Sequence, residues 1–164
     1  MTQEFSSMNT SVNSKKLPAI YHKINWKELK KEKRFVRVLD FGSGRYITHI
    51  MEFINYNKGI YYPYDPYWMT ELRNEVSLNC NPDIIVCSNV LCVIKEDEII
   101  QDIVSKLLSY NVPVVFTVYE GDKSGVGKPT TKGYQRNQSI GDYCLHHSLI
   151  TYHGVITNDK SIIL

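Results

Sequence analysis

Two acidic residues and two glycines in the first half of the chain have the spacing of a ligand site. Asp40 ends an apolar run and is followed at once by Gly42 and Gly44. Asp65 comes about 25 positions later, where a second strand should end. In doubly wound α/β proteins, glycines after the first strand let the backbone approach a nucleotide-type ligand, and an acid after the second strand binds its ribose. This spacing predicts such a site at the carboxyl edge of a parallel sheet.

The same residues argue against a dinucleotide. A dinucleotide-binding turn needs a third glycine at position 47, which is Ile47 in this chain. Asp40 would repel a pyrophosphate but suits a ligand with a positive ammonium group, and Asp65 offers acceptors for both ribose hydroxyls. A cofactor with an amino-acid end and a ribose but no phosphate fits these demands. S-adenosyl-L-methionine is such a cofactor.

Four stretches of the chain then carry a resemblance to a known family: Ser14-Lys15-Lys16-Leu17-Pro18, Leu39-Asp40-Phe41-Gly42-Ser43-Gly44, Tyr64-Asp65-Pro66-Tyr67 and Thr117-Val118-Tyr119-Glu120-Gly121-Asp122. Residues 14 to 143 resemble the class I S-adenosylmethionine-dependent methyltransferases, in particular small members of phage or prophage type. The resemblance implies a methyltransferase that moves a methyl group to an acceptor. It leaves open whether that acceptor is a small molecule, a nucleic acid or a protein.

The resemblance also implies which residues bind the cofactor. The turn after the first strand should hold the methionine end, Asp65 the ribose, and Trp68 the adenine by stacking. Ser88 and Asn89 should lie beside the reacting methyl group, although they also suit a helix cap. The full expected set is Asp40, Gly42, Ser43, Gly44, Asp65, Pro66, Trp68, Ser88 and Asn89.

Tyr119, Glu120 and Asn89 are the candidate catalytic residues. Tyr119 and Glu120 should end a later strand at the same edge of the sheet. Methyl transfer from a sulfonium depends more on alignment than on proton transfer, so these side chains would position the acceptor first and act as bases second. Purely structural roles for both remain open. No cysteine or histidine spacing predicts a metal site.

Two other functions compete with methyl transfer. One is a non-catalytic, methyltransferase-like protein that acts by binding the cofactor or another protein. The other is a Rossmann-like enzyme that uses a different nucleotide. The segment Gly121–Lys128 looks like a phosphate-binding P-loop, but it has one residue too many between its glycines, and Pro129 stands where Ser or Thr is required.

Composition narrows the class of protein. The 164 residues suit one domain. With 19 basic and 17 acidic residues the net charge is small, so it does not indicate a protein that binds polyanions through its overall charge. No apolar run approaches the ~20 residues of a membrane span. The four cysteines show no paired spacing, which favours reduced thiols and hence a cytoplasmic protein.

The amino-terminal region divides in two. Residues 1–13 are rich in Ser, Thr and Asn and are expected to be a disordered tail, with the methyltransferase-like domain over 14–164. Lysines recur from Lys15 to Lys33. They form either a solvated face or an arm that contacts phosphates, in which case the substrate is a nucleic acid or nucleotide.

The pattern of the chain predicts a single-domain α/β fold with a mostly parallel sheet and a carboxyl-terminal antiparallel hairpin. The resemblance implies that this fold is of Rossmann-like methyltransferase type. About eighteen residues separate Asp65 from the next strand, so the usual third strand should be short or missing, which puts the adenine pocket in doubt. The hairpin is expected to turn at Asn158-Asp159. Strands are expected at 34–41, 59–64, 83–87 and 112–118, helices at 21–34 (a short helix or lid), 46–56, 97–110 and 134–145, and a loop at 121–133.

Overall fold

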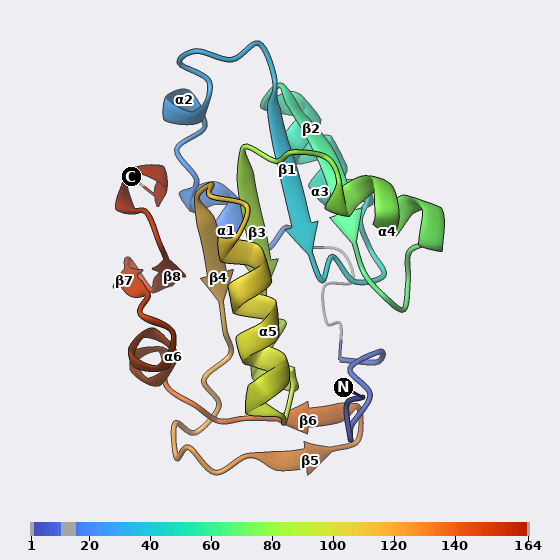
Figure 1. Ribbon diagram of the computed structural model, residues 1–164, viewed down its shortest axis with the longest axis vertical. Helices are drawn as coiled ribbons and strands as arrows, with labels where there is room; N and C mark the ends of the chain where they lie inside the picture. Colours follow the sequence, from blue (N-terminus) through green and yellow to red (C-terminus); the bar gives the residue numbers. More distant parts are fainter. Residues whose placement is uncertain (1, 11–15, 164) are drawn as a thin grey trace.

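The computed structural model describes residues 2–10 and 16–163 of the chain. Ser14 and Lys15 of the first resembling stretch, and residues 11–13 of the expected tail, lie outside the described residues. The described chain has an α/β architecture built on one six-stranded sheet (Figure 1). A second, two-stranded sheet lies at one end of the molecule (Figure 1).

The main sheet has the strand order β2-β1-β3-β4-β8-β7. The first four strands run parallel, and β8 and β7 join them antiparallel. Parallel pairing requires crossover connections, which the helices between these strands supply. The strands are β1 (Val36–Phe41), β2 (Gly59–Tyr64), β3 (Ile84–Ser88), β4 (Val114–Thr117), β7 (Ile150–Tyr152) and β8 (Val155–Thr157), and the small sheet pairs β5 (Lys128–Thr130) with β6 (Gly133–Gln135).

Helices cover both faces of the main sheet because its central strands are apolar on both sides. Val36 and Val38 of β1 pack with α1, α2 and α3, whereas Leu39 and Phe41 pack with α5 and α6 on the other face. The helices are α1 (Ile20–Lys23), α2 (Trp26–Leu29), α3 (Thr48–Tyr56), α4 (Glu71–Leu78), α5 (Asp97–Leu108) and α6 (Ile140–His147), with 3-10 turns η1 (Leu91–Val93) and η2 (Lys160–Ile163).

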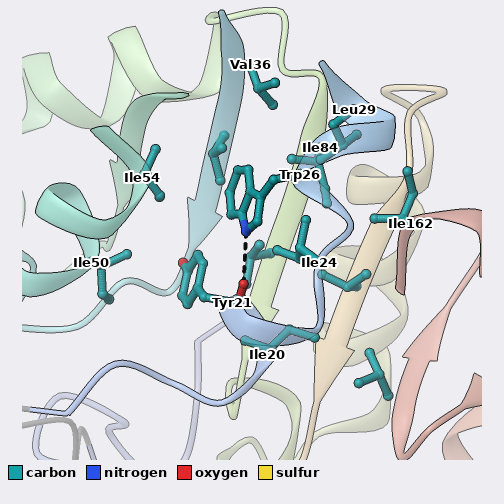
Figure 2. Packing of buried hydrophobic residues seen from close by; sticks show 14 residues of the cluster. Ile20, Tyr21, Ile24, Trp26, Leu29, Val36, Ile50, Ile54, Ile84 and Ile162 are labelled. Atoms are coloured by element: carbon teal, nitrogen blue, oxygen red, sulfur yellow. Dashed lines mark hydrogen bonds between the residues drawn. The ribbon is translucent and has the colours of Figure 1, made fainter. Parts of the chain in front are cut away.

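Figure 2 shows the core on the first of these faces. Trp26 packs between α3 and the sheet, and its indole Nε1 donates a hydrogen bond to the Tyr21 carbonyl at 3.1 Å. Ile84 of β3 and Ile162 of η2 are buried in the same cluster. The short helices α1 and α2 are therefore held by burial of their apolar side chains, since four-residue helices have little stability of their own.

The parallel strands and the helices between them confirm the α/β class and the mostly parallel sheet that were expected from the sequence. Between β2 and β3 the chain forms α4 alone, with no further strand, as the short spacing predicted. The sheet does end in an antiparallel hairpin, but its predicted turn was wrong. The chain reverses at His153-Gly154, whose φ angles of 47° and 74° suit a two-residue hairpin turn. Asn158 instead bonds the main chain of Val112 and Val114.

Other boundaries also differ from the prediction. The single short helix expected over 21–34 is instead two four-residue helices, α1 and α2, separated at Ile24 and Asn25. The expected helix over 134–145 begins only at Ile140, because Ser139 and Asp142 form a reciprocal cap on its first turn. Residues before this cap form β6 (Gly133–Gln135) instead of helix. β6 pairs with β5, which lies inside the 121–133 segment that was predicted to be a loop. Turn residues such as Gly133 permit this hairpin, but its three-residue strands carry too little pattern to be recognised in advance.

The central strand should carry more of the stability than the edge strand. Replacing Ile84, which is fully buried in β3, by Ala should cost about 3 kcal/mol of unfolding free energy through lost burial and a residual cavity. Ile60→Ala in β2, where the side chain is 40% exposed, is the matched control and should cost less than about 1 kcal/mol. Urea unfolding of the two variants measures both values, and equal losses would contradict the assignment of the core.

Candidate functional site

A cavity of about 200 Å³ lies at the carboxyl ends of β1, β2 and β3. Open parallel sheets place their ligands at this edge. In Figure 1 the arrows of β1 and β3 point toward the end of the molecule that holds the amino-terminal segment and β6. The lining residues are Gln3, Ser7, Met8, Thr10, Phe41, Gly42, Ser43, Gly44, Tyr64, Asp65, Pro66, Tyr67, Trp68, Ser88, Asn89, Val90, Val93, Ile94 and Ile103.

The turn after β1 requires glycine at two positions. Gly42 and Gly44 have φ angles of 79° and 72°, in the left-handed region that side chains with a Cβ rarely adopt. A Cβ on Gly42 would also lie 2.2 Å from Cγ2 of Val90, across the cavity wall. The two glycines therefore let the turn close against the segment that follows β3.

The amides of this turn are already bonded within the protein. The amides of Gly42 and Ser43 both donate to the Tyr64 carbonyl, at 2.8 Å and 3.0 Å. The Gly44 amide donates to Oδ2 of Asp65 at 2.9 Å. A phosphate-binding turn presents free amides to its anion, so this turn is not arranged to cradle a pyrophosphate.

Asp65 joins the two ligand-facing turns. Its Oδ1 accepts from the amides of Tyr67 at 2.9 Å and Trp68 at 3.1 Å, while its Oδ2 holds Gly44. The residue is buried. A carboxylate offers about four acceptor positions, so about one remains for a ligand hydroxyl. Of the described residues that line the cavity, Asp65 is the only one with an ionisable acid or basic side chain other than tyrosine.

Asp40 lies away from the cavity. It is not among the lining residues, and its Oδ2 accepts a hydrogen bond of 2.6 Å from the Tyr61 hydroxyl. Burial raises the pKa of Asp40 to about 6, and the hydrogen bond from Tyr61 offsets part of that rise. The expected contact between Asp40 and a ligand ammonium therefore has no counterpart in this arrangement. Alternation along β1 explains this, because Asp40 shares the face of Val36 and Val38.

Three short polar side chains follow the strands at this edge. Ser43 is buried, and its Oγ has no hydrogen-bond partner among the described residues. The Ser88 hydroxyl bonds the Thr117 hydroxyl of β4 at 2.9 Å. Asn89 adopts a left-handed φ of 58°, and its amide donates to the Thr117 carbonyl at 2.8 Å. Asparagine tolerates this conformation better than most residues, and the turn directs the chain toward η1 rather than capping it by a side chain.

Trp68 and Pro66 also line the cavity, as expected. The indole Nε1 of Trp68 donates to the Met8 carbonyl at 3.1 Å. The guanidinium of Arg45 lies 5.1 Å from the centre of the indole ring, within the range of a cation–π contact. Two groups from distant parts of the chain thus fix the position of this ring.

Tyr119 and Glu120 are not among the lining residues. Tyr119 is exposed, and Glu120 holds the start of α6 by accepting from the Ile140 amide at 2.9 Å. That hydrogen bond, together with the contact with Lys123, lowers the pKa of Glu120. A carboxylate with a lowered pKa is a weaker base. Of the three candidate catalytic residues, the structure places Asn89 alone in the cavity wall.

Residues 2–10 take part in the site, which no pattern in the sequence indicated. Gln3, Ser7, Met8 and Thr10 line the cavity, although their composition predicted a tail that is disordered until something docks it. Small polar residues carry no periodic pattern, so only their tertiary contacts reveal the role.

The lysines of the basic region are divided between the two edges of the sheet. Lys33 bonds Asp83, which precedes β3, and Figure 1 shows α2, which carries Lys27, at the end opposite the amino-terminal segment. Lys23 instead bonds the His153 carbonyl in the turn between β7 and β8, which the register of β8 places at the carboxyl end of β4. None of the described lysines is among the residues that line the cavity.

A second cavity, of about 540 Å³, lies between α5 and α6. Arg136 lines it, but its guanidinium already bonds the carbonyls of Ile94 and Lys95 and the carboxylate of Asp97. His147 bonds Gln101 across the cavity. Within the described ranges no three His, Cys, Asp or Glu side chains gather as a metal site.

Comparison with models of protein families, with curated proteins and with solved structures finds no match to this chain. None of the described helices has both the length and the apolar character needed to cross a membrane.

The buried carboxyl of Asp40 should make stability depend on pH. Its pKa is about 6 in the folded chain and about 3.8 when unperturbed, so the folded state binds this proton more tightly. The stabilisation that the protonated Asp40 carboxyl gives to the folded state is therefore complete below about pH 4 and is lost as the pH rises through about 6. Asp40→Asn should gain up to about 3 kcal/mol relative to the natural chain above pH 6 and little at pH 4.

Urea unfolding of both proteins between pH 4 and 8 measures this difference, and a constant difference would contradict it. Asp83→Asn is a control of opposite sign. Partial burial acts to raise the pKa of Asp83, but hydrogen bonds from Arg37 and Lys33 lower it overall. That variant should lose stability at neutral pH, with the loss shrinking as the pH falls below about 4.

Proposed function

We propose that this protein is an S-adenosylmethionine-dependent methyltransferase. One observation carries the proposal: the glycine turn and the Asp65 turn, which the sequence singled out, line the same cavity at the carboxyl edge of the parallel sheet. The finer assignment of the fold to the Rossmann-like methyltransferase type is part of the same proposal. The methyl acceptor is not identified by any feature of the cavity.

The charge of the cavity supports this cofactor over a phosphate-bearing one. Asp65 contributes a negative charge, and the lining residues in the described part of the chain include no Lys or Arg. The amides of the glycine turn are taken by Tyr64 and Asp65. A pyrophosphate would therefore find no cation among the described lining residues and no free amide in the glycine turn. A ligand with a sulfonium and an ammonium group meets an attractive charge instead.

Several described residues fit parts of this cofactor. Asp65 has about one acceptor position left for a ribose hydroxyl, and Trp68 presents an aromatic ring for adenine stacking. Ser43, with its unpartnered hydroxyl, and Asn89 supply polar groups for the methionine end. The fit is incomplete in one respect, because Asp40 lies on the other face of the sheet.

When bound, S-adenosylmethionine would supply an electrophilic methyl group whose leaving group departs neutral. The protein then needs to align the acceptor with that methyl group and to exclude water, rather than to move a proton early. Val90, Val93 and Ile94 give the cavity an apolar wall beside Asn89. Tyr119 and Glu120, which lie outside this wall, would act on the acceptor only from the rim.

The alternative is a methyltransferase-like protein that binds without catalysis. The lining of the cavity favours it in one way, since Asp65 is the only carboxylate there among the described residues and its oxygens already hold three amides. Cofactor binding without methyl transfer to nucleic acid, protein or small-molecule fractions would support this alternative.

Ligand-dependent stability tests the cofactor. A ligand at ~100 times its dissociation constant should add about 2.7 kcal/mol, a shift of several degrees in Tm for a chain of this size. S-adenosylmethionine and S-adenosylhomocysteine should raise Tm, whereas NAD and ATP should not. A shift with NAD or ATP alone would favour the other nucleotide enzyme, and no shift with the two sulfur ligands would overturn the proposal.

A pair of glycine substitutions tests the site itself. Gly42→Ala should abolish the shift in Tm with S-adenosylhomocysteine, because the new methyl group meets Val90 and forces the turn to move. Gly125→Ala is the matched control: its φ of 73° imposes similar backbone strain, but nothing lies within 4 Å of the added Cβ. The control should lose some stability and keep the ligand shift, and loss of the shift in both variants would count against the site.

A further inference from the structure

Residues 2–10, which we call the amino-terminal strap, line the cavity and contact three separate segments of the domain. The Glu4 carboxylate pairs with Lys95, and the Glu4 amide donates to Oε1 of Glu96 at 2.7 Å. The Phe5 ring stacks on Tyr134 of β6, with ring centres 5.3 Å apart. The strap is thus anchored beside η1 and on the small sheet.

A glycine in the small sheet allows this close approach. Gly133 has a φ of 145°, and a Cβ added there would lie 2.7 Å from the carbonyl oxygen of Ser6. Backbone-to-backbone proximity of this kind is the usual reason for glycine at a strand position. The contact adjoins the stacking of Phe5 on Tyr134 and places the middle of the strap against the small sheet.

The strap also reaches the groups that a ligand would use. The Met8 carbonyl accepts the indole N–H of Trp68, and Oε1 of Gln3 accepts from the Tyr67 hydroxyl at 3.4 Å. Gln3, Ser7, Met8 and Thr10 form one wall of the cavity. The strap therefore occupies the side of the site that is next to the Asp65 turn.

The size of the cavity is the decisive quantity. With the strap in place it measures about 200 Å³. Pockets for drug-sized ligands occupy ~300–1,000 Å³. A nucleoside joined to an amino acid belongs to that class, so it needs more space than the cavity offers with the strap in place. The Asp65 turn is tied to the turn after β1 by hydrogen bonds between buried groups, whereas the hydrogen bonds that hold the strap lie at exposed positions.

We infer that the amino-terminal strap is an autoinhibitory lid that must leave the cavity wall before a nucleoside-sized ligand binds. The idea that the ligand is S-adenosylmethionine rests on the proposed function, but the opening of the strap does not. Its anchors are suited to release. Both charged groups of the Glu4–Lys95 pair are substantially exposed, and exposed pairs are weak and screened by salt.

At any moment, only the fraction of protein molecules in which the strap is open can then bind the ligand. A ligand for a partly populated state binds with an apparent dissociation constant that is raised by the inverse of that fraction. Weakening the anchors should increase the open fraction, and so should tighten binding while leaving the rest of the cavity intact.

Thiol accessibility tests the lid without reference to any ligand. Val93 lines the cavity, so Val93→Cys in the full chain introduces a thiol there, and peptide mass spectrometry follows the rate at which maleimide adds to it. Combining Val93→Cys with Glu4→Ala and Phe5→Ala should raise this rate about tenfold, the factor that corresponds to ~1.4 kcal/mol of lost docking free energy. Added salt should raise the rate in the intact strap as well.

Two controls separate release of the strap from general loosening. Glu32→Ala with Phe35→Ala removes an exposed acid and an exposed aromatic ring at the far end of β1, and should leave the labelling rate of the introduced thiol unchanged. Cys144 on α6 is half-buried and lies outside the cavity, so its own labelling rate should be equal in all variants. Gly133→Ala, which displaces the strap at a different contact, should act like the anchor variant.

Calorimetric titration with S-adenosylhomocysteine then distinguishes the two proposals. Faster labelling together with about tenfold tighter binding supports both the lid and the cofactor. Faster labelling with no binding to any variant keeps the lid and removes the cofactor assignment. An unchanged labelling rate of the introduced thiol in both the anchor variant and Gly133→Ala overturns the lid, whatever the ligand does.

Discussion

The carboxylate of Asp65 is the interaction on which the site depends. It binds the amide of Gly44 in one turn and the amides of Tyr67 and Trp68 in the next. Hydrogen bonds to an ionised acceptor are stronger than neutral ones, so one buried side chain fixes the relative position of two loops that start from different strands. The backbone of Trp68 is placed by the same oxygen atoms, whereas Met8 and Arg45 hold its ring.

The large elements were predictable because their signals are local. Apolar strands over Val36–Phe41 and Ile84–Ser88, and the regular apolar face of α5, define the parallel sheet without knowledge of tertiary contacts. The spacing between Asp65 and β3 also indicated that a further strand would be short or missing, since chain length alone limits what fits there. The carboxyl-terminal turn was predicted at the wrong dipeptide because Asn158 looks like a turn residue, whereas it serves as a bridge to the backbone of β4.

The site was predictable only in its backbone features. Gly42, Gly44 and Asp65 lie where the spacing placed them, since glycine turns and acids at strand ends follow from the topology of the sheet. The directions in which side chains point could be predicted less well from the sequence. Asp40 points to Tyr61 because of its place in the alternation of β1, and Glu120 caps α6, whose start depends on Ser139 rather than on β4. The part played by residues 2–10 rests on contacts between distant segments, which no local pattern encodes.

The chain between β2 and β3 forms no strand within the described residues, and β2 lies at the border of the sheet. Such a border offers unpaired main-chain donors and acceptors to any other extended chain, which is a route to aggregation. The carbonyl of Tyr64 points toward the β1 side of the strand. Backbone groups of successive residues in a strand point to opposite sides, so those of Pro63 point away from β1, to the open border of the sheet. Proline has no N–H to offer there, and its carbonyl is already taken by the hydroxyl of Ser77 on α4 at 2.7 Å. One residue thus removes both a donor and an acceptor from the border, and helps to keep a shortened sheet from growing by addition of foreign strands.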